Sequence, residues 1–263
     1  MINLSDDDLE WLKREQPQLL HRGNIIRGAI SYSMLYDPFS GHYTLNPEGS
    51  PRAHEVYHED TYRISIDLDV HRSYPSVREV SDKILTTQRR MGRAQGDMHI
   101  NSDGTFCLEA LQELEKAFRN VFTLSTYINQ YVIPFLFEQT HMRLTGDWAW
   151  KPLPHYEAGP LEWYYLKAEK GSIEDGILSL KAIAATGINA GEFYKRLITS
   201  QMYRLSPCLC RSGKPAIYCC PRAMYGYKKL RKLFLKISQT DLTLVLKHMN
   251  SSAVEATPTP PNL

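Results

Sequence analysis

Four of the five cysteines in this 263-residue chain lie close together, and their spacing constrains the fold of the C-terminal part more than any other feature. They form two tight pairs, Cys208-Leu-Cys210 and Cys219-Cys220. Four thiolates from two such pairs can complete a tetrahedral shell around one ion with no open position, which is typical of structural zinc. The segment from Ser212 to Pro215 supplies the sharp turn that such a site needs. We therefore predict one structural Zn²⁺, bound by Cys208, Cys210, Cys219 and Cys220.

The fifth cysteine, Cys107, stands apart from this cluster. A thiol is the one side chain here with intrinsic nucleophilicity at neutral pH. Most free cysteines are small buried apolar residues, so that interpretation has to be considered for Cys107 as well. Gly104 just before it and helical sequence just after it favour an exposed loop, which makes Cys107 the candidate nucleophile.

Composition and charge limit the class of protein. Apolar content of 43%, charged content of 23% and a net charge of +2 are ordinary for a globular chain and indicate neither acidic nor basic partners. No apolar run is long enough to span a bilayer, and the acidic start is unlike a signal peptide. We expect a cytoplasmic protein with no membrane partner, where reduced cysteines hold metal more often than they form disulfides.

The pattern along the chain predicts an α+β fold, with an antiparallel sheet covered by helices. Ser5 followed by Asp8 marks the start of a short helix that runs through Gln16. Apolar residues alternate from Tyr62 to Val70, which indicates a half-buried strand. Other expected elements are strands over 24–36 and 42–45, a turn over 37–41, and helices over 108–122 and 124–146, the second kinked or split at Pro134.

We place a domain boundary near Lys170. Residues 1–170 form the main domain, with the N-terminal helix and the sheet. Residues 171–255 form a helical segment that carries the four cysteines, with helical spacing around Leu178, Leu180 and Ile183. Residues 256–263 are mostly Thr and Pro, which predicts a disordered tail.

The order of these features resembles a known family. A helix, antiparallel strands, Tyr74-Pro75, a loop, and then a cysteine just before helical sequence is the layout of ubiquitin-conjugating enzymes. The resemblance spans roughly residues 20 to 165 and depends on Tyr74-Pro75 and on the segment from Ile100 to Leu108. The chain is similar to divergent bacterial members, some of which stand beside cyclic-nucleotide synthases in CBASS-type anti-phage operons. The resemblance implies a ubiquitin-conjugating-enzyme-like fold with Cys107 as the acyl acceptor.

The family's His-Pro-Asn signature is not retained, since it falls on Asp97-Met98-His99. In the family the signature Asn shapes the active-site loop and stabilises the oxyanion, and His99 takes its place here. An imidazole N–H is a competent donor to an oxyanion. We name His99 and Asn101 as further candidate catalytic residues. Nearby carboxylates that would orient an attacking lysine are Asp97, Asp103 and Glu109, and the sequence ranks none above the others.

The resemblance implies a thioester-forming transferase that passes the acyl group to an amine or thiol. The chain is too short to include an adenylating domain, so it would receive a thioester that is already activated. The donor would be a protein with an activated C-terminus, such as a cyclic-nucleotide synthase of the CD-NTase type. The enzyme would then regulate anti-phage signalling.

The cysteine quartet resembles the SEC-C zinc-binding motif, with Arg211 in place of the usual glycine. The alternative for these residues is a redox or disulfide pair.

Two other functions stay open. The run His54-Glu55-Val56-Tyr57-His58 fits the H-E-x-x-H signature of zinc metalloproteases, with His71 or Asp60 as a third ligand. Its chemistry needs a rigid helix, but Val56 and Tyr57 favour a strand. The other alternative is a non-enzymatic, zinc-stabilised adaptor in which Cys107 is inert.

A run of basic and aromatic residues follows the quartet, from Tyr225 to Lys236. It predicts an amphipathic helix with Leu230, Leu233 and Phe234 facing the core. A nucleic-acid partner is not favoured, because the near-neutral total charge does not indicate a basic surface.

Overall fold

The strand predicted from the apolar alternation around Tyr62 lies inside an antiparallel sheet. The computed structural model describes residues 1–70, 73–151 and 153–236. In it the strand is β4 (Val56–Asp67), which begins earlier than expected and buries Tyr62, Ile64 and Ile66 almost completely. The fold class is α+β, with an antiparallel sheet and flanking helices.

The sheet has the strand order β1-β2-β4-β5, and β3 pairs with the far end of β2. Its long strand β2 (Ile25–Asp37) and the short β3 (His42–Leu45) match the predicted strands. Between them the Gly41 amide donates to the Asp37 carbonyl at 2.8 Å, which closes the predicted turn. The edge strands β1 (Leu19–Arg22) and β5 (Ser76–Glu79) were not predicted, because four residues are too few to show an alternation.

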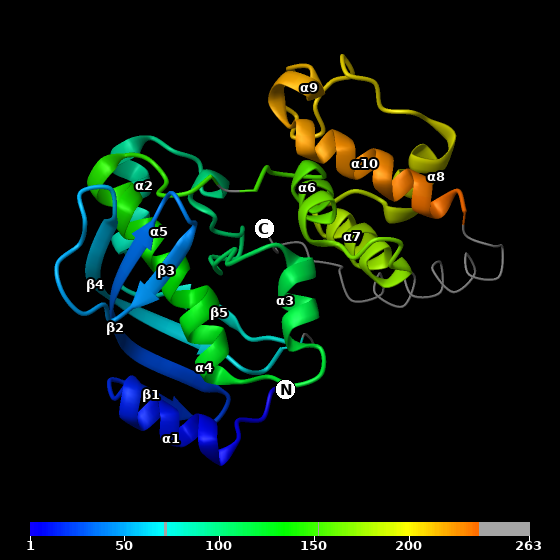
Figure 1. Cartoon of the computed structure of the whole chain (residues 1–263). Helices are drawn as coiled ribbons and strands as arrows, with labels where there is room; N and C mark the ends of the chain where they lie inside the picture. The colour runs from blue at the N-terminus through cyan, green and yellow to red at the C-terminus, as the bar shows by residue number, and fades with distance from the viewer. Residues whose placement is uncertain (71–72, 152, 237–263) are drawn as a thin grey trace, which may run out of the picture. The chain divides into compact units, whose positions relative to one another are not determined.

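Helices lie against this sheet (Figure 1). The first, α1 (Asp6–Glu15), has the predicted capping box between Ser5 and Asp8. After β5 come α2 (Lys83–Met91), the 3-10 turn η1 (Gly96–Met98) and α3 (Leu111–Phe118), which is shorter than the predicted helix. The second predicted helix consists of three consecutive parts: α4 (Leu124–Tyr127), the π-helical η2 (Ile128–Val132) and α5 (Ile133–Thr145).

The π-helical segment has a local cause in Pro134. Proline has no N–H to donate, and its ring crowds the preceding turn. The wider turns of η2 directly precede Pro134, which stands in the first turn of α5. The proline therefore interrupts the regular helix, and the chain continues through it into α5.

Among the described residues, a second compact unit contains 110–112 and 153–236, while the first contains 1–70, 73–109 and 113–151. The division falls before the boundary predicted near Lys170. The reason is α6 (Ala158–Lys167), which packs closely on α10 (Pro221–Phe234) in the second unit. An added Cβ at Gly226 of α10 would lie 1.8 Å from the Leu161 carbonyl oxygen, so the two backbones are almost in contact.

The second unit also contains α7 (Ile173–Ala185), α8 (Ala190–Thr199) and α9 (Ala216–Cys219). Its core surrounds Trp163 and includes Leu230 and Phe234, so the predicted apolar face of α10 is confirmed. The predicted disordered tail, 256–263, lies outside the described residues. Among the described helices, none has the length and apolar character needed to cross a membrane.

Candidate functional site

A short hairpin carries Cys107. The Cys107 amide donates to the carbonyl of His99 at 2.8 Å, and the Asn101 amide donates to the carbonyl of Thr105 at 2.8 Å. At the tip, the Gly104 amide donates to the Asn101 carbonyl at 2.9 Å. Gly104 has a φ of 83°, a conformation that glycine adopts without strain. The sequence therefore forms a tight turn that returns the chain at Cys107, directly opposite His99.

The hairpin is anchored on the edge of the sheet. Thr105 forms a bridge with Arg78 of β5, and the Phe106 amide donates to the Val77 carbonyl at 2.7 Å. The buried Phe106 ring stacks on Phe135 of α5, with the centroids 4.4 Å apart. The residue before Cys107 is thus fixed on two sides, by backbone pairing and by ring packing.

Two predicted polar residues, Asn101 and Asp103, are used inside the hairpin. The Asn101 amide nitrogen Nδ2 donates to Thr105 Oγ1 at 3.0 Å and to the Phe106 carbonyl at 3.4 Å. The Asp103 carboxylate accepts from the Thr105 amide at 3.0 Å and from its hydroxyl at 2.6 Å. Burial acts to raise the pKa of Asp103, but these hydrogen bonds outweigh it and the pKa is lowered. Both side chains hold the hairpin in shape.

Of the five cysteines, all within the described residues, Cys107 alone is exposed. Surrounding protein atoms still displace water around the thiol, and this desolvation raises its pKa. The negative charge of Glu109 raises the pKa further. Cys107 is therefore an exposed residue whose thiol is mainly protonated at neutral pH, since even an ordinary thiol ionises only near pH 8.5.

His99 ends the turn η1 in a left-handed conformation, with a φ of 52°. Its ring meets Trp148 edge to face, with the centroids 5.1 Å apart. Left-handed geometry is uncommon for residues other than glycine, and Asn and His are among those that adopt it most often. The structure thus places His99 beside Cys107 at the base of the hairpin.

The three predicted carboxylates differ in position. Asp103 is committed to the hairpin, and Asp97 accepts a hydrogen bond from the Ala94 amide at 3.3 Å. Glu109 is exposed, and its charge acts on the Cys107 thiol. Of the three, Glu109 is the carboxylate whose charge raises the pKa of Cys107.

The four C-terminal cysteines come together in the second unit. All four sulfur atoms lie within 4.8 Å of one another. Cys210 Sγ is 3.4 Å from Cys219 Sγ, which is in turn 3.8 Å from Cys220 Sγ. A zinc ion with Zn–S bonds of about 2.3 Å would space its sulfurs about 3.8 Å apart, so the cluster fits a tetrahedral thiolate site. The group could bind a metal ion.

The backbone around the cluster explains how two pairs converge. The Arg211 amide donates to the Cys208 carbonyl at 3.0 Å, and the Cys208 amide donates to the Lys214 carbonyl at 2.9 Å. Cys219 closes α9, and Cys220 stands immediately before α10. One pair therefore lies on a tight turn and the other at the junction of two helices.

Arg211 has a φ of 61°, the left-handed region in which a glycine would be relaxed. Its guanidinium carbon lies 4.1 Å from the centre of the Tyr156 ring and its Nη2 lies 3.7 Å from the buried Glu157 carboxylate. These contacts offset the backbone strain and explain why a large cation stands at this position.

The His54–His58 run does not form the helix that the metalloprotease signature requires. His54 lies in a turn, with Nε2 3.7 Å from Asp37, whereas His58 belongs to β4. His58 Nε2 lies 2.9 Å from Nδ1 of His141, an imidazole outside the motif. Asp60 is paired with cations, and His71 lies outside the described residues. Within the described part of the chain, the one group of three or more clustered metal-ligand residues is the cysteine quartet.

Comparisons with known proteins add no assignment. No protein-family model matches the sequence, and neither a curated protein nor a solved structure gives a significant match. The function must therefore be argued from the residues themselves.

Sequence reasoning missed the paired imidazoles of His58 and His141 and the buried carboxyl of Glu138. Burial lowers the pKa of His58 to about 4, helped by His141. Burial also raises the pKa of Glu138 to about 7, although the amides of Ala149 and Trp150 donate to it at 2.9 and 3.0 Å. His58 lies about eighty residues before His141 in the sequence, so no spacing rule indicates their contact.

Proposed function

We propose that the first unit is a ubiquitin-conjugating-enzyme-like cysteine acyltransferase that carries its acyl group on Cys107. The observation that carries the proposal is that Cys107, alone of the five cysteines, is exposed, on a hairpin fixed by hydrogen bonds and packing. A capped helix, an antiparallel sheet and Tyr74-Pro75 ahead of the hairpin agree with the family layout.

The reaction has two balanced steps. The Cys107 thiolate attacks the carbonyl carbon of a donor thioester, a new C–S bond forms, and the donor thiolate leaves. An amine of the acceptor then attacks the same carbon, an amide bond forms, and the Cys107 thiolate leaves while the amine loses a proton to water or to a carboxylate. Thioester exchange between similar thiols is nearly balanced in free energy, so the main task of the protein is to position the acyl carbon.

Each neighbour has a role in this proposal. His99 would donate from its ring to the oxyanion that forms in each step. Glu109 would orient the attacking amine and accept its proton. Asn101 acts through the hairpin, because its side chain is occupied by Thr105 and Phe106. It is a positioning residue.

The family resemblance also suggests the partner. The donor would be a protein with an activated C-terminus, such as a bacterial cyclic-nucleotide synthase of the CBASS type, and the chain would regulate anti-phage defence in the cytoplasm. This assignment depends on analogy with the family. The recognition chemistry on this chain is the exposed thiol and the carboxylate of Glu109 next to it.

For the second unit we propose one structural Zn²⁺, held by the four cysteines in the manner of a SEC-C motif. Four sulfur donors with near-tetrahedral spacing favour zinc over hard cations, which prefer oxygen. The ion would fix the turn at Cys208 to the start of α10 and leave no open position for catalysis. Metal analysis of the purified chain should give one zinc per molecule, and two would favour the metalloprotease alternative.

A direct test uses a fluorescent peptide with a C-terminal thioester as the donor. The wild-type chain should form a labelled adduct that a reducing thiol releases. The variant Cys107→Ser should form an oxyester adduct that resists the thiol, and Cys107→Ala should form none. Peptide mass spectrometry would locate the label.

The controls separate enzyme from adaptor. Two results would mean that Cys107 is inert and that the chain is a zinc-stabilised adaptor. One is that the variant Cys107→Ala still becomes labelled, and the other is that the wild-type chain, with its zinc retained, forms no adduct at any pH. His99→Ala should slow transfer by about 100-fold if a donor to the oxyanion is lost. His99→Asn should restore much of the rate, because Asn tolerates the left-handed backbone and still donates a hydrogen bond.

The raised pKa of Cys107 can be tested without a donor. Alkylation of Cys107 by iodoacetamide should accelerate with pH above about 8.5, the ordinary thiol value. Glu109→Gln removes a negative charge beside the thiol, so it should shift this profile to lower pH. Glu113→Gln, four residues further on, is the matched control, and an equal shift in both variants would contradict the role of Glu109.

A further inference from the structure

We propose that the second unit binds single-stranded nucleic acid along a basic groove beside α10. The groove has a volume of about 310 Å³ and belongs entirely to the second unit. The proposal is independent of the acyl-transfer chemistry assigned to Cys107.

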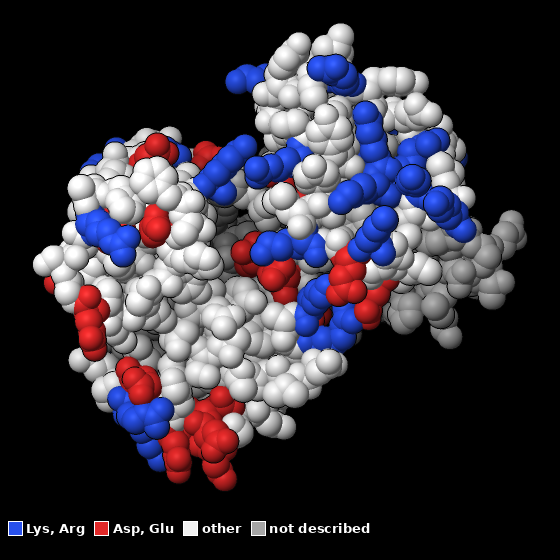
Figure 2. All heavy atoms as spheres, in the orientation of Figure 1, with Lys and Arg blue, Asp and Glu red and all other residues white. Residues whose placement is uncertain are grey.

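Charge is unevenly distributed along the chain. The net charge of the whole chain is +2, yet residues 193–240 contain eleven Lys and Arg and no Asp or Glu. On the face shown in Figure 2, these cations gather over α8 and α10. The near-neutral total therefore conceals a strongly basic region, which removes the argument made above against a nucleic-acid partner.

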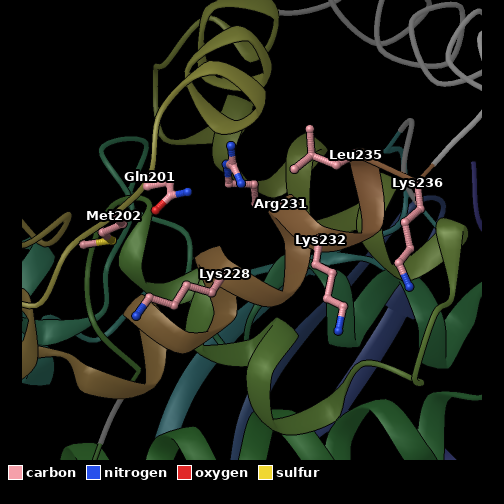
Figure 3. A pocket seen from close by; sticks show the side chains of 7 residues that line it. All are labelled: Gln201, Met202, Lys228, Arg231, Lys232, Leu235 and Lys236. Atoms are coloured by element: carbon pink, nitrogen blue, oxygen red, sulfur yellow. The ribbon is translucent and has the colours of Figure 1, made fainter.

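The groove is built by one face of α10 and the segment that follows α8. Lys228, Lys232 and Lys236 succeed one another at intervals of four residues; the first two stand on α10, Lys236 stands two residues beyond its end, and Figure 3 labels all three. Lys228 and Lys232 are about 6 Å apart along the axis, given a rise of about 1.5 Å per residue. The other lining residues are Gln201, Met202, Arg231 and Leu235, so the lining as described has four cations and no carboxylate.

Arg231 is held in place by the end of α8. Its Nε donates to the Ser200 carbonyl at 3.2 Å, and its Nη2 donates to the Ile198 carbonyl at 3.3 Å. Hydrogen bonds to carbonyls leave its positive charge uncompensated. Arg231 thus provides a rigid charged wall, while the exposed lysines can adjust to successive phosphates.

Aromatic rings continue the line of lysines. Tyr225, which is 44% exposed, lies one turn before Lys228, whose Nζ is 5.8 Å from the centre of its ring. The Tyr165 ring packs beside Tyr225, with the centroids 5.8 Å apart, and Lys229 Nζ lies 4.8 Å from its centre. A line of cations with accessible rings at one end suits a strand whose phosphates bind the lysines and whose unpaired bases stack on tyrosine.

Other polyanions fit less well. A membrane-surface helix inserts its apolar face into lipid, whereas Leu230 and Phe234 of α10 are buried in the protein core. A duplex has its bases already stacked and would leave the Tyr225 ring unused. An acidic peptide offers charge at less regular intervals and no bases to stack. Single-stranded nucleic acid uses both features of the groove.

The test measures fluorescence anisotropy of labelled oligothymidylate and oligouridylate with the full chain. Four phosphate contacts should give a slope of log affinity against log salt of about −3, because each contributes about −0.7 on a single strand. The double variant Lys228→Glu and Lys232→Glu should bind at least tenfold more weakly and roughly halve the slope. Tyr225→Ala should weaken binding with the slope unchanged, since a stacking contact releases no counterion.

The matched control is Lys167→Glu with Lys170→Glu, which makes the same charge change at two exposed lysines of the second unit that do not line the groove. Equal weakening in both double variants would overturn the assignment of the site. Equal or tighter binding of a duplex of the same length, a polyglutamate peptide or phosphatidylserine vesicles would overturn the choice of ligand. Zinc content and circular dichroism must match the wild type in every variant that is compared.

Discussion

The two units are held together by different means. In the first unit, a sheet packs on α5, and charged and hydroxyl side chains form a network around Asp60. In the second unit, α6 and α10 approach almost to backbone contact at Gly226, and four cysteines converge. Both units pair buried or partly buried carboxylates with cations, but the second also carries a row of exposed lysines on and just after α10.

This difference has a physical origin in the amount of sheet. The antiparallel pairing of β2 with β4 extends over twelve residue pairs, which orders a large part of the first unit without any cross-link. The described part of the second unit contains helices and none of the strands, and the segment between α8 and α10 is mostly turns. Such segments bury little apolar surface for each ordered residue and are commonly stabilised by metal. The comparison predicts which variants disturb which unit.

The largest effect should come from Cys219→Ser, which removes one ligand of the proposed zinc site. Metal binding contributes on the order of 10 kcal/mol in such modules, so the second unit should lose most of its stability. Hydrogen exchange measured by mass spectrometry should accelerate around Trp163 and remain unchanged in β2 and β4. Cys107→Ser is the matched control and should keep both the metal and the slow exchange. Unchanged metal content in Cys219→Ser would contradict the site.

Two glycine-to-alanine variants, one in each unit, test how backbone packing contributes to the stability of that unit. Gly226→Ala would place a Cβ 1.8 Å from the Leu161 carbonyl oxygen in the second unit, and Gly28→Ala one 1.9 Å from the Gln18 carbonyl oxygen in the first. Backbone must move in both cases, so each should destabilise its own unit by about 3 kcal/mol. Urea unfolding followed by hydrogen exchange would assign each loss to a unit.

Gly191→Ala is the control for helix propensity. Gly191 stands exposed in the first turn of α8, where the nearest atom to an added Cβ is Asn189 Oδ1 at 3.2 Å. It should change stability by less than about 1 kcal/mol, because the helix propensity of alanine opposes the cost of shifting the Asn189 side chain. A comparable loss in Gly191→Ala and Gly226→Ala would mean that the contact of α6 with α10 is not the cause.

What could be predicted from the sequence was local. The capping box at Ser5, the alternation from Tyr62 and the convergence of the cysteines depend on residues close in the chain, and each is confirmed. The helix α2 was missed because its N-cap, Asp82, makes no capping hydrogen bond from its side chain and gives no usual start signal. The helix α6 was also missed, because the turn before it contains His155 and Tyr156, which are not usual helix-start residues.

The features that the sequence did not predict depend on contacts between distant residues, or on local charge that the total charge does not show. Asp60 meets Thr140 and Arg143 across about eighty residues, and His58 meets His141 over a similar span, so no periodicity indicates either contact. The total charge is a sum over an acidic part and a basic part of the chain, so it gave no sign of the basic groove beside α10. For the candidate site, an exposed loop at Cys107 was predicted, but its hairpin form and the role of Asn101 inside it required the structure.

The next largest effect should come from Asp60→Asn in the first unit. The Asp60 carboxylate accepts from Lys83 Nζ at 2.6 Å, from Arg143 Nη2 at 2.8 Å and from Thr140 Oγ1 at 2.9 Å. Removing its charge leaves two partly buried cations without their counter-ion, which should cost about 2 to 3 kcal/mol near neutral pH. Asp69→Asn, at an exposed position just after β4, is the matched control and should be near neutral.

The pH dependence of that loss has a definite sign. Burial acts to raise the pKa of Asp60, but the hydrogen bonds from Lys83, Thr140 and Arg143 outweigh it, so the pKa is lowered in the folded state. The stabilisation is present above the ordinary value of 3.8 and is lost as the pH falls through the lowered one. Urea unfolding should show that the free energies of unfolding of the wild type and of Asp60→Asn become equal in acid. A difference that persists in acid would mean that the substitution acts through side-chain shape and not through charge.

The smallest effect concerns Glu138 and His58, whose pKa shifts oppose each other. Glu138 titrates near 7 in the folded state against an ordinary 4.5, so the folded unit keeps a proton that the unfolded chain releases, and stability falls as the pH rises between these values. His58 titrates near 4 against an ordinary 6.5, so stability rises with pH over that interval. In the wild type the two trends partly cancel.

Glu138→Gln should expose the trend of His58. Without the carboxyl, the free energy of unfolding of the first unit should increase with pH more steeply, by up to about 1.4 kcal/mol per pH unit in the interval where both groups titrate. Glu10→Gln, on the exposed side of α1, should leave the wild-type slope unchanged. The comparison uses slopes because Gln can accept only one of the two amide hydrogen bonds made by Glu138, which lowers stability equally at every pH. An unchanged slope in Glu138→Gln would show that the carboxyl is already ionised in the folded unit, and that the amides of Ala149 and Trp150 are sufficient to hold its charge.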